Sequence, residues 1–256
     1  MSEDEPLSGL RLDRMTWPEV EKRLDAGTRT VVVAVGATEQ HGPHLPLLVD
    51  AEHGDRLAPE IASRLGNALA APTIRVGCSE HHMDFPGTIS LRAETLVEVC
   101  RDYCTSLARH GFRTICLAPT HGGNFDVIEG ALPGLNESVP GDAEVRAFTD
   151  LEAVVETWRR VAEERAGRGE RVGGHADLAE TSILALLRPE LVRDDRARAG
   201  YSGPTDRETL DDIIEEGFES VTESGILGDA RGFDPAIGER CVAELADLMA
   251  AAFRGD

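Results

Sequence analysis

Lysine is almost absent from this sequence, while acidic residues are abundant. Of the 26 lysines and arginines only Lys22 is a lysine, and 47 aspartates and glutamates bring the net charge to -21. This charge excludes nucleic acid and anionic membranes as partners, because both carry the same sign. Abundant carboxylates with almost no lysine suit a high-salt cytoplasm, where screening keeps a strongly charged surface soluble. We therefore expect a halophilic source. The alternative is a GC-rich genome with an acidic surface.

Long apolar stretches are missing as well. The chain contains no run of transmembrane length, and its start, MSEDEPLSGL, is acidic where a secretory signal would be basic and then apolar. We expect a cytoplasmic protein in which residues 1–10 form a flexible acidic tail. The five cysteines are scattered and show neither a disulfide framework nor zinc-ribbon spacing. A chain of 256 residues can bury a sizeable core, and we expect one domain over residues 1–256.

Apolar runs of strand length alternate with helical patterns along the chain. The patterns predict strands at residues 30–37, 69–77, 112–120 and 144–150, and helices at 50–65, 93–110, from about 125, 151–166, 179–187 and 235–253. Asp50 is placed to cap the first of these helices. Residues 194–224 are polar and acidic, and we expect them to form a surface excursion with a short helix. Strands that alternate with helices predict an α/β fold with a mostly parallel sheet covered on both faces.

Polar side chains follow three of the predicted strands. Glu39 and His41 follow the first strand, Ser79 and His82 the second, and His121 the third. In parallel sheets, ligands bind beyond the carboxyl ends of the strands. We therefore expect these side chains to gather at one edge of the sheet and to form a single site.

The chemistry of this site follows from its mixture of imidazoles and carboxylates. Zinc, manganese and ferrous iron all accept nitrogen and oxygen ligands of this kind. The candidate ligands are Glu39, His41, Asp50, His121 and Glu180. Two metals lying close together need a bridging carboxylate, and Asp50 is the natural candidate. Water held by such a pair becomes a nucleophile near neutral pH, and His175 is placed to pass its proton to a departing nitrogen.

Each of these groups also has an ordinary interpretation. His41 and His44 are common residues in polar loops, and His44 is equally consistent with a supporting role beside the metals and with a purely structural one. The turn HGGN at 121–124 would also suit a phosphate held on backbone amides. Glu180 would fit a capping box at the start of a helix. None of these interpretations explains why the groups cluster at strand ends.

Four motifs occur in an order and at distances that resemble one known family. They are GATEQHGPHLPL (36–47), FPGTISL (85–91), HGGN (121–124) and HADLAETS (175–182), and GILGD (225–229) resembles a further segment. Together they resemble the creatininase family of metal-dependent amidohydrolases over about residues 30 to 235. The resemblance implies a three-layer α/β/α sandwich, commonly assembled as a homo-oligomer such as a hexamer.

The resemblance also assigns roles to individual residues. It places Glu39 and His41 on one metal each, with Asp50 bridging both. His121 binds the same metal as Glu39. Glu180 completes the ligands of the metal bound by His41, and it is counted among the catalytic residues together with His175. His175 occupies the position of the proton-handling histidine. Ser79 and His82 would line the substrate side.

The sequence departs from the family pattern at positions that bear on the substrate. HADLAETS replaces the usual HAGExETS, so that Asp177 and Leu178 stand for Gly and Glu. Creatinine-hydrolysing members carry a tyrosine and a metal-binding glutamate at the positions of Gly122 and Gly123, and a Trp-Asp pair where this chain has Arg171 and Val172. Creatinine is therefore not the expected substrate.

Two other branches of the family fit the sequence better. One removes formate from a ribosylated formamidopyrimidine on an archaeal route to flavin and deazaflavin cofactors. The other is a peptidase that trims the precursor peptide of mycofactocin. We expect a hydrolase with two divalent metals (zinc, manganese or iron) that cleaves a small amide or formamide, such as a formamidopyrimidine nucleotide. The alternatives are peptide trimming and a non-catalytic binding subunit.

Overall fold

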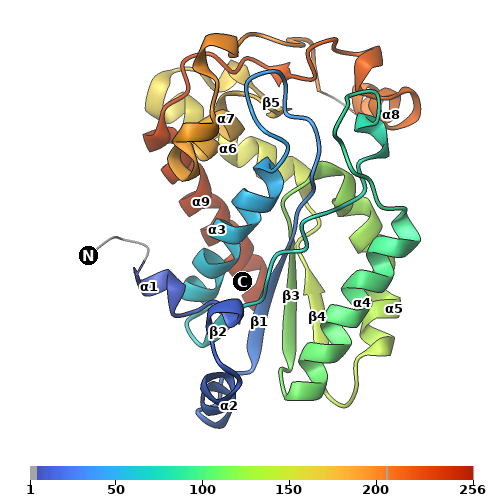
Figure 1. Ribbon diagram of the computed structural model, residues 1–256, viewed down its shortest axis with the longest axis vertical. Helices are drawn as coiled ribbons and strands as arrows, with labels where there is room; N and C mark the ends of the chain where they lie inside the picture. Colours follow the sequence, from blue (N-terminus) through green and yellow to red (C-terminus); the bar gives the residue numbers. More distant parts are fainter. Residues whose placement is uncertain (1–4, 206, 256) are drawn as a thin grey trace.

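A parallel four-stranded sheet forms the centre of the molecule (Figure 1). The computed structural model describes residues 5–205 and 207–255. The strands are β1 (Thr30–Val35), β2 (Ala68–Ala70), β3 (Thr114–Pro119) and β4 (Glu144–Ala147), in the order β2-β1-β3-β4. Residues 31–35 of β1 are fully buried, as expected for a strand covered on both faces.

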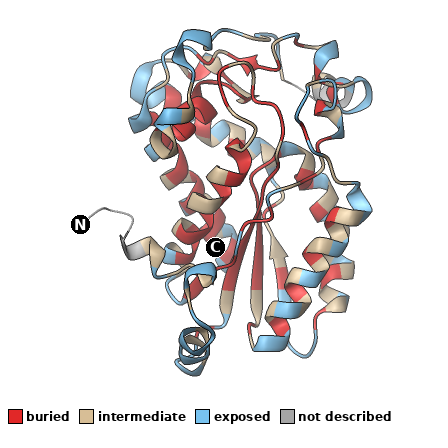
Figure 2. Ribbon diagram, in the orientation of Figure 1, coloured by how far each residue is buried: buried red, intermediate tan, exposed pale blue. Residues whose placement is uncertain are grey.

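Helices cover both faces of this sheet and complete three layers. On one face lie α4 (Ala93–His110) and α5 (Phe125–Ser138), which pack against Val31 and Val33. On the other face lie α3 (Val49–Leu65), α6 (Leu151–Ala166), α7 (Leu178–Leu187) and α9 (Pro235–Arg254), which pack against Val32 and Ala34. Figure 2 shows the buried residues concentrated in the strands and on the helix sides that face them. The predicted α/β sandwich is confirmed.

Shorter elements surround the upper end of the sheet in Figure 1. An antiparallel pair, β5 (Val172–His175) and β6 (Leu227–Gly228), lies near α8 (Arg207–Glu216). Short 3-10 helices span Glu80–His82, Gly122–Asn124 and Phe218–Ser220. At the opposite end lies α2 (Trp17–Asp25), and α1 (Glu5–Ser8) lies beside α3 on the left of the view. Among the described residues, none of the helices combines the length and the apolar character needed to cross a bilayer.

Most predicted helices begin and end within one residue of the observed ones, but the predicted strands are too long and one predicted helix cap is wrong. The strand predicted at 69–77 stops at Ala70, because Pro72 has no N–H to donate to a neighbouring strand. Asp50 does not cap α3. The N-cap is Leu48, and Asp50 lies in the first turn with its side chain directed to two histidines.

The expected N-terminal tail is partly ordered. Residues 5–8 form α1, and the carbonyl of Leu10 accepts a hydrogen bond from the amide of Ala70 at 2.8 Å. Leu10 also packs against the core on the α3 face. Residues 1–4 of the expected tail lie outside the described part of the chain.

Candidate metal centre

The predicted site residues meet at the carboxyl end of the sheet. The loop after β1 carries Glu39 and His41, α3 begins with Asp50 in its first turn, and His121 follows β3. β5 ends at His175, and Glu180 lies in the first turn of α7. All of these residues are buried, with at most 7% of the surface of any of them exposed. The structure thus brings together residues from four separate stretches of the sequence.

One cluster consists of Glu39, Asp50 and His121. The Nδ1 atom of His121 lies 3.2 Å from Asp50 Oδ2 and 3.6 Å from Glu39 Oε1. One possible ligand atom from each residue lies within 4.8 Å of the other two. This spacing would allow one cation to contact all three side chains.

A second cluster lies on the other side of Asp50. His41 Nε2 is 3.3 Å from Asp50 Oδ1 and 3.6 Å from Glu180 Oε2. One carboxylate oxygen of Asp50 therefore faces His41, and the other faces His121. This is the arrangement required of a carboxylate that bridges two cations.

The hydrogen bonding of these groups tests whether the site fits a metal. Both carboxylate oxygens of Glu39, Asp50 Oδ2 and His41 Nε2 are buried and make no hydrogen bond with any described residue. Burying such groups is costly unless they are paired or bind a metal. The donor set of carboxylates and imidazoles suits zinc, manganese and iron. The residues present therefore fit a divalent metal.

The pKa values reflect the same crowding of charges in the metal-free protein. Burial raises the pKa of Glu39 to about 7. Burial alone would also raise the pKa of Asp50, but the adjacent His41 and His121 bring it below its ordinary value. Burial lowers the pKa of His121, yet the close carboxylates of Asp50 and Glu39 favour its charged form and raise the pKa to about 10. Without metal, positive charge is thus held by the imidazole of His121.

His175 lies beside this centre with its ring 4.4 Å from that of His41. Its Nδ1 is 3.8 Å from Glu39 Oε1, and its Nε2 lies 3.0 Å from both the main-chain oxygen and the side-chain nitrogen of Gln40. Burial and the neighbouring His41 keep the pKa of His175 well below its ordinary value. Gln40 thus orients a neutral imidazole whose other nitrogen faces the carboxylates.

Ser79 and His82 contact predicted metal ligands. Ser79 Oγ lies 3.2 Å from His121 Nε2, and His82 Nδ1 lies 3.3 Å from Glu39 Oε2. The ring of His82 stacks on Phe218 at 4.2 Å, and Phe218 lies 4.7 Å from His175. The predicted substrate contacts of Ser79 and His82 stay predictions.

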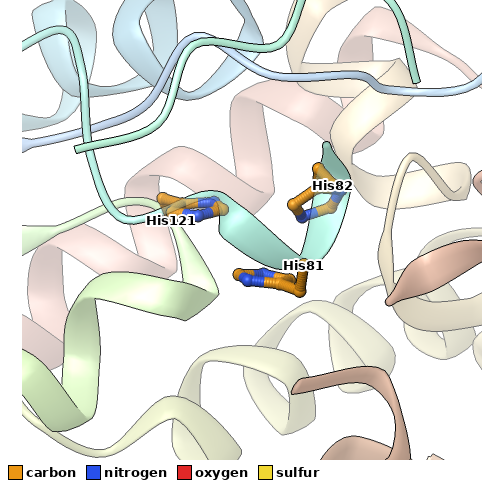
Figure 3. A group of neighbouring side chains, drawn as sticks. All are labelled: His81, His82 and His121. Carbon is orange, nitrogen blue, oxygen red and sulfur yellow. The ribbon is translucent and has the colours of Figure 1, made fainter. Parts of the chain in front are cut away.

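His81 was missed by the sequence analysis, although it adjoins His82 in the chain. Figure 3 shows His81, His82 and His121 as neighbours. The rings of His81 and His121 lie nearly parallel, at 11° and 5.6 Å. One ring nitrogen from each of the three histidines lies within 4.8 Å of the other two, so this group would also be close enough to contact one cation.

The altered motif HADLAETS has a structural explanation. The carboxylate of Asp177 caps α7 by accepting hydrogen bonds from the amides of Ala179 and Glu180. Its other oxygen accepts from the amides of Gly173 and Gly174 in β5. Asp177 therefore joins the strand that ends at His175 to the helix that carries Glu180. The substitution keeps both site residues in place.

Comparisons with known proteins agree with the geometry. A family model described as "Creatininase: Creatinine amidohydrolase" matches residues 13–253. The chain belongs to the creatininase family. It is 32% identical over 240 residues to a mycofactocin precursor peptide peptidase of Mycobacterium ulcerans, covering 91% of this chain and 83% of that protein. It is also 32% identical over 196 residues to a creatinine amidohydrolase of Pseudomonas putida, covering 71% and 73%.

Solved structures of the creatininase family share the fold. A single-site mutant of creatininase superposes with a TM-score of 0.78 at 28% identity, covering 96% of this chain and 98% of the other. Two further creatininase structures are named for manganese and for a zinc–zinc form. The predicted family is confirmed, and the family and the buried cluster together support a metal-binding amidohydrolase.

Proposed function

We propose that this creatininase-family chain binds two divalent cations and hydrolyses a C–N amide bond. The observation that carries the proposal is the position of Asp50, whose two oxygens face His41 on one side and His121 on the other. Glu39, Asp50 and His121 would hold one cation, and His41, Asp50 and Glu180 the other. When bound, such cations lower the pKa of water and polarise the amide carbonyl. Zinc, manganese and iron all remain candidates.

The protein's own side chains would handle the proton. Amide hydrolysis breaks the C–N bond, adds the water oxygen to the carbon and transfers a proton to the leaving nitrogen. His175 adjoins both metal clusters, since it lies against His41 and Glu39. Gln40 fixes the orientation of its ring. His175 would take the proton from water and donate it to the amine.

For the substrate, we propose a peptide amide ahead of the formamide that we expected from the sequence. A relative that matches 91% of this chain is named as a peptidase of the mycofactocin precursor peptide. Gly123 argues against a creatinine-type ligand set, because a Cβ atom there would lie 2.2 Å from the carbonyl oxygen of Cys78. Glutamate could not replace this glycine without moving the backbone. A formamidopyrimidine nucleotide stays the second candidate.

The metal content of the purified protein tests the proposal first. We expect about two divalent ions per chain by elemental analysis, and their loss in Asp50→Ala. Asp150→Asn is the matched control, because Asp150 caps α6 at the surface and is unconnected with the site. An absence of metal in the wild-type protein, even after reconstitution with zinc, manganese or iron, would contradict the proposal.

Substrate screening of the metal-loaded protein tests the second part. Short peptides, formamides and creatinine should be compared by the release of new amine or formate. Turnover of peptides that is lost in Asp50→Ala supports the peptidase. Turnover of formamides alone would replace it with the deformylase. Tight binding of a metabolite by the metal-loaded protein, without any turnover, would favour a non-catalytic subunit.

We also propose that the protein is cytoplasmic, as its acidic N-terminal sequence suggested, and that it assembles as a homo-oligomer such as a hexamer, as the family resemblance suggested. Light scattering on the eluate of a sizing column measures the mass directly. A mass close to 27.6 kDa, which is that of one chain, would contradict the assembly.

A further inference from the structure

A cavity lies behind the candidate metal centre, between the sheet and the α3, α6 and α9 layer. Glu180 lines it, as do Thr120 and Gly122 on either side of His121, and Gly174 just before His175. Its wall also includes His53 of α3 and Trp158 of α6. The cavity therefore adjoins three residues of the proposed site from the side of the helices.

Two polar atoms of these lining residues lack a hydrogen-bond partner among the described residues. His53 Nε2 and Trp158 Nε1 are buried and make no hydrogen bond within the described part of the chain. His53 is 3% exposed and Trp158 is 4% exposed, and their ring centroids are 5.7 Å apart. Buried polar groups in proteins nearly always have a partner, which is either protein or ordered water. A partner for both groups is therefore expected in the cavity that both residues line.

The size of the cavity restricts what this partner can be. About 20 Å³ is open to the centre of a water molecule, and one water needs roughly 10–15 Å³ on this measure. The volume open to water is thus sufficient for one water molecule. The indole N–H can only donate, whereas water can accept from it and still bond the imidazole nitrogen of His53. Thr120 and Glu180 offer further oxygen atoms on the cavity wall.

We infer that this cavity is a water site of the hydrolase: it holds an ordered water bonded to Trp158 Nε1 and His53 Nε2, and supplies the water consumed in hydrolysis. Each turnover would use one water molecule, and a substrate bound over the metals would limit the entry of another from that side. An internal reserve beside Glu180 would replace that water without waiting for the substrate side to open. The supply role rests on the proposed hydrolase function, whereas the water site itself does not.

A crystal structure at a resolution that shows buried waters tests the site directly. The wild-type protein should show a water peak within hydrogen-bond distance of both ring nitrogens. Trp158→Phe removes the donor and should lose or displace this water. Val154→Ile keeps the donor but adds a methylene group to the cavity wall, and should also expel the water. A wild-type cavity without a peak, in a map that shows other buried waters, would overturn the inference.

Fluorescence provides a readout independent of activity and metal. The chain has two tryptophans, and Trp17 is 76% exposed. In a Trp17→Phe background the emission reports Trp158 alone, and should shift to shorter wavelength when Val154→Ile removes the water. An unchanged spectrum would contradict a hydrogen-bonded indole.

Kinetics then separate the water site from the supply role. With a substrate identified as above, Trp158→Phe and Val154→Ile should lower kcat several-fold and leave KM unchanged, whereas Trp17→Phe alone should change neither. If the water is present in the wild type but both cavity variants keep full kcat, the supply role is wrong. If no substrate is hydrolysed at all, the proposed function fails while the crystallographic and spectroscopic results still decide the water site.

Discussion

The Nε2 atom of His44 lies 2.9 Å from the hydroxyl of Thr181, the residue that follows Glu180. Both residues are fully buried. Burial lowers the pKa of His44 to about 4, so that its imidazole is neutral at pH 7. The contact joins the loop after β1 to the first turn of α7, and each of these segments carries a predicted metal ligand. Between the two interpretations of His44 left open by the sequence, this contact favours a supporting role beside the metals.

Thr181→Val should lower the free energy of unfolding, because it leaves His44 Nε2 without a hydrogen-bond partner. Loss of a buried partner costs about 1–3 kcal/mol of unfolding free energy, measured by denaturant titration. Thr105→Val is the matched control, because the hydroxyl of Thr105 is half-buried and bonds only to carbonyls of its own helix. Equal losses of unfolding free energy in both variants would show that the His44 contact contributes no more to stability than an ordinary hydroxyl within a helix.

Asp177→Asn tests the cap that ties β5 to α7. The wild-type carboxylate accepts four backbone N–H groups, whereas an amide would turn its NH₂ toward two of them. We expect a loss of roughly 2–4 kcal/mol, because two buried donors lose their acceptor. At Asp150, an exposed N-cap, the same replacement should change stability by only a few tenths of a kcal/mol, because Asn caps helices as well as Asp does.

A stability of Asp177→Asn close to that of the wild type would contradict this account. The residue would then be a tolerated departure from the family motif, and Glu180 would need another source of support. Metal content measured on the same variant shows whether Glu180 is still held in place, since a displaced α7 should also weaken metal binding.

Metal binding should release protons. In the metal-free protein the pKa of His121 is about 10, because Asp50 and Glu39 stabilise its charged form against the effect of burial. At pH 7 His121 is therefore protonated, yet a histidine ligand must be neutral. The apparent affinity should rise with pH below about 10, by roughly tenfold per pH unit for each proton released.

The same raised pKa has a consequence for the stability of the metal-free protein. A raised histidine pKa adds stability that is fully present below its unfolded value of about 6.5, and this contribution is lost as pH rises through about 10.

The release of protons on metal binding can be measured by titration calorimetry in two buffers of different ionisation enthalpy. Identical heats of metal binding in both buffers would contradict proton release. His121→Asn should reduce the difference in heat between the two buffers.

Much of the fold was predictable because it depends on local patterns. The valines of β1 and the 3.6-residue periodicity of α4 indicate strand and helix without knowledge of the rest of the chain. The ends of β1 and β3 also placed Glu39, His41 and His121 at one edge, since parallel strands end together. Asp50, His175 and Glu180 were named as candidates for their chemistry, and the motifs that resemble a known family then assigned their individual roles.

Contacts between distant segments could not be predicted in this way. Phe218 comes from a stretch that reads as a polar surface excursion, yet its ring packs on His82 and His175. The side chain of Gln40 reaches the carbonyl of Gly225, 185 residues away. These contacts depend on how the chain returns over the sheet, and the hydrophobic periodicity of the sequence does not predict that path. The partners of Asp177 became apparent only when β5 was placed beside α7.

The acidic surface leads to a prediction about salt. With 47 acidic and 26 basic residues, many carboxylates have no opposite charge to pair with. Salt weakens exposed pairs such as Arg160–Glu164, which contribute about 0–1 kcal/mol each, but it also screens the repulsion among all the unpaired carboxylates. Because the net charge is -21, we expect the screening of carboxylate repulsion to dominate and stability to rise with salt.

The melting temperature should therefore be higher in 2 M than in 0.1 M potassium chloride, roughly a change from weak to strong screening. Chloride is the appropriate anion, since sulfate strengthens apolar burial in any protein. A melting temperature that stays constant or falls with potassium chloride would contradict a halophilic adaptation and favour the GC-rich interpretation of the composition.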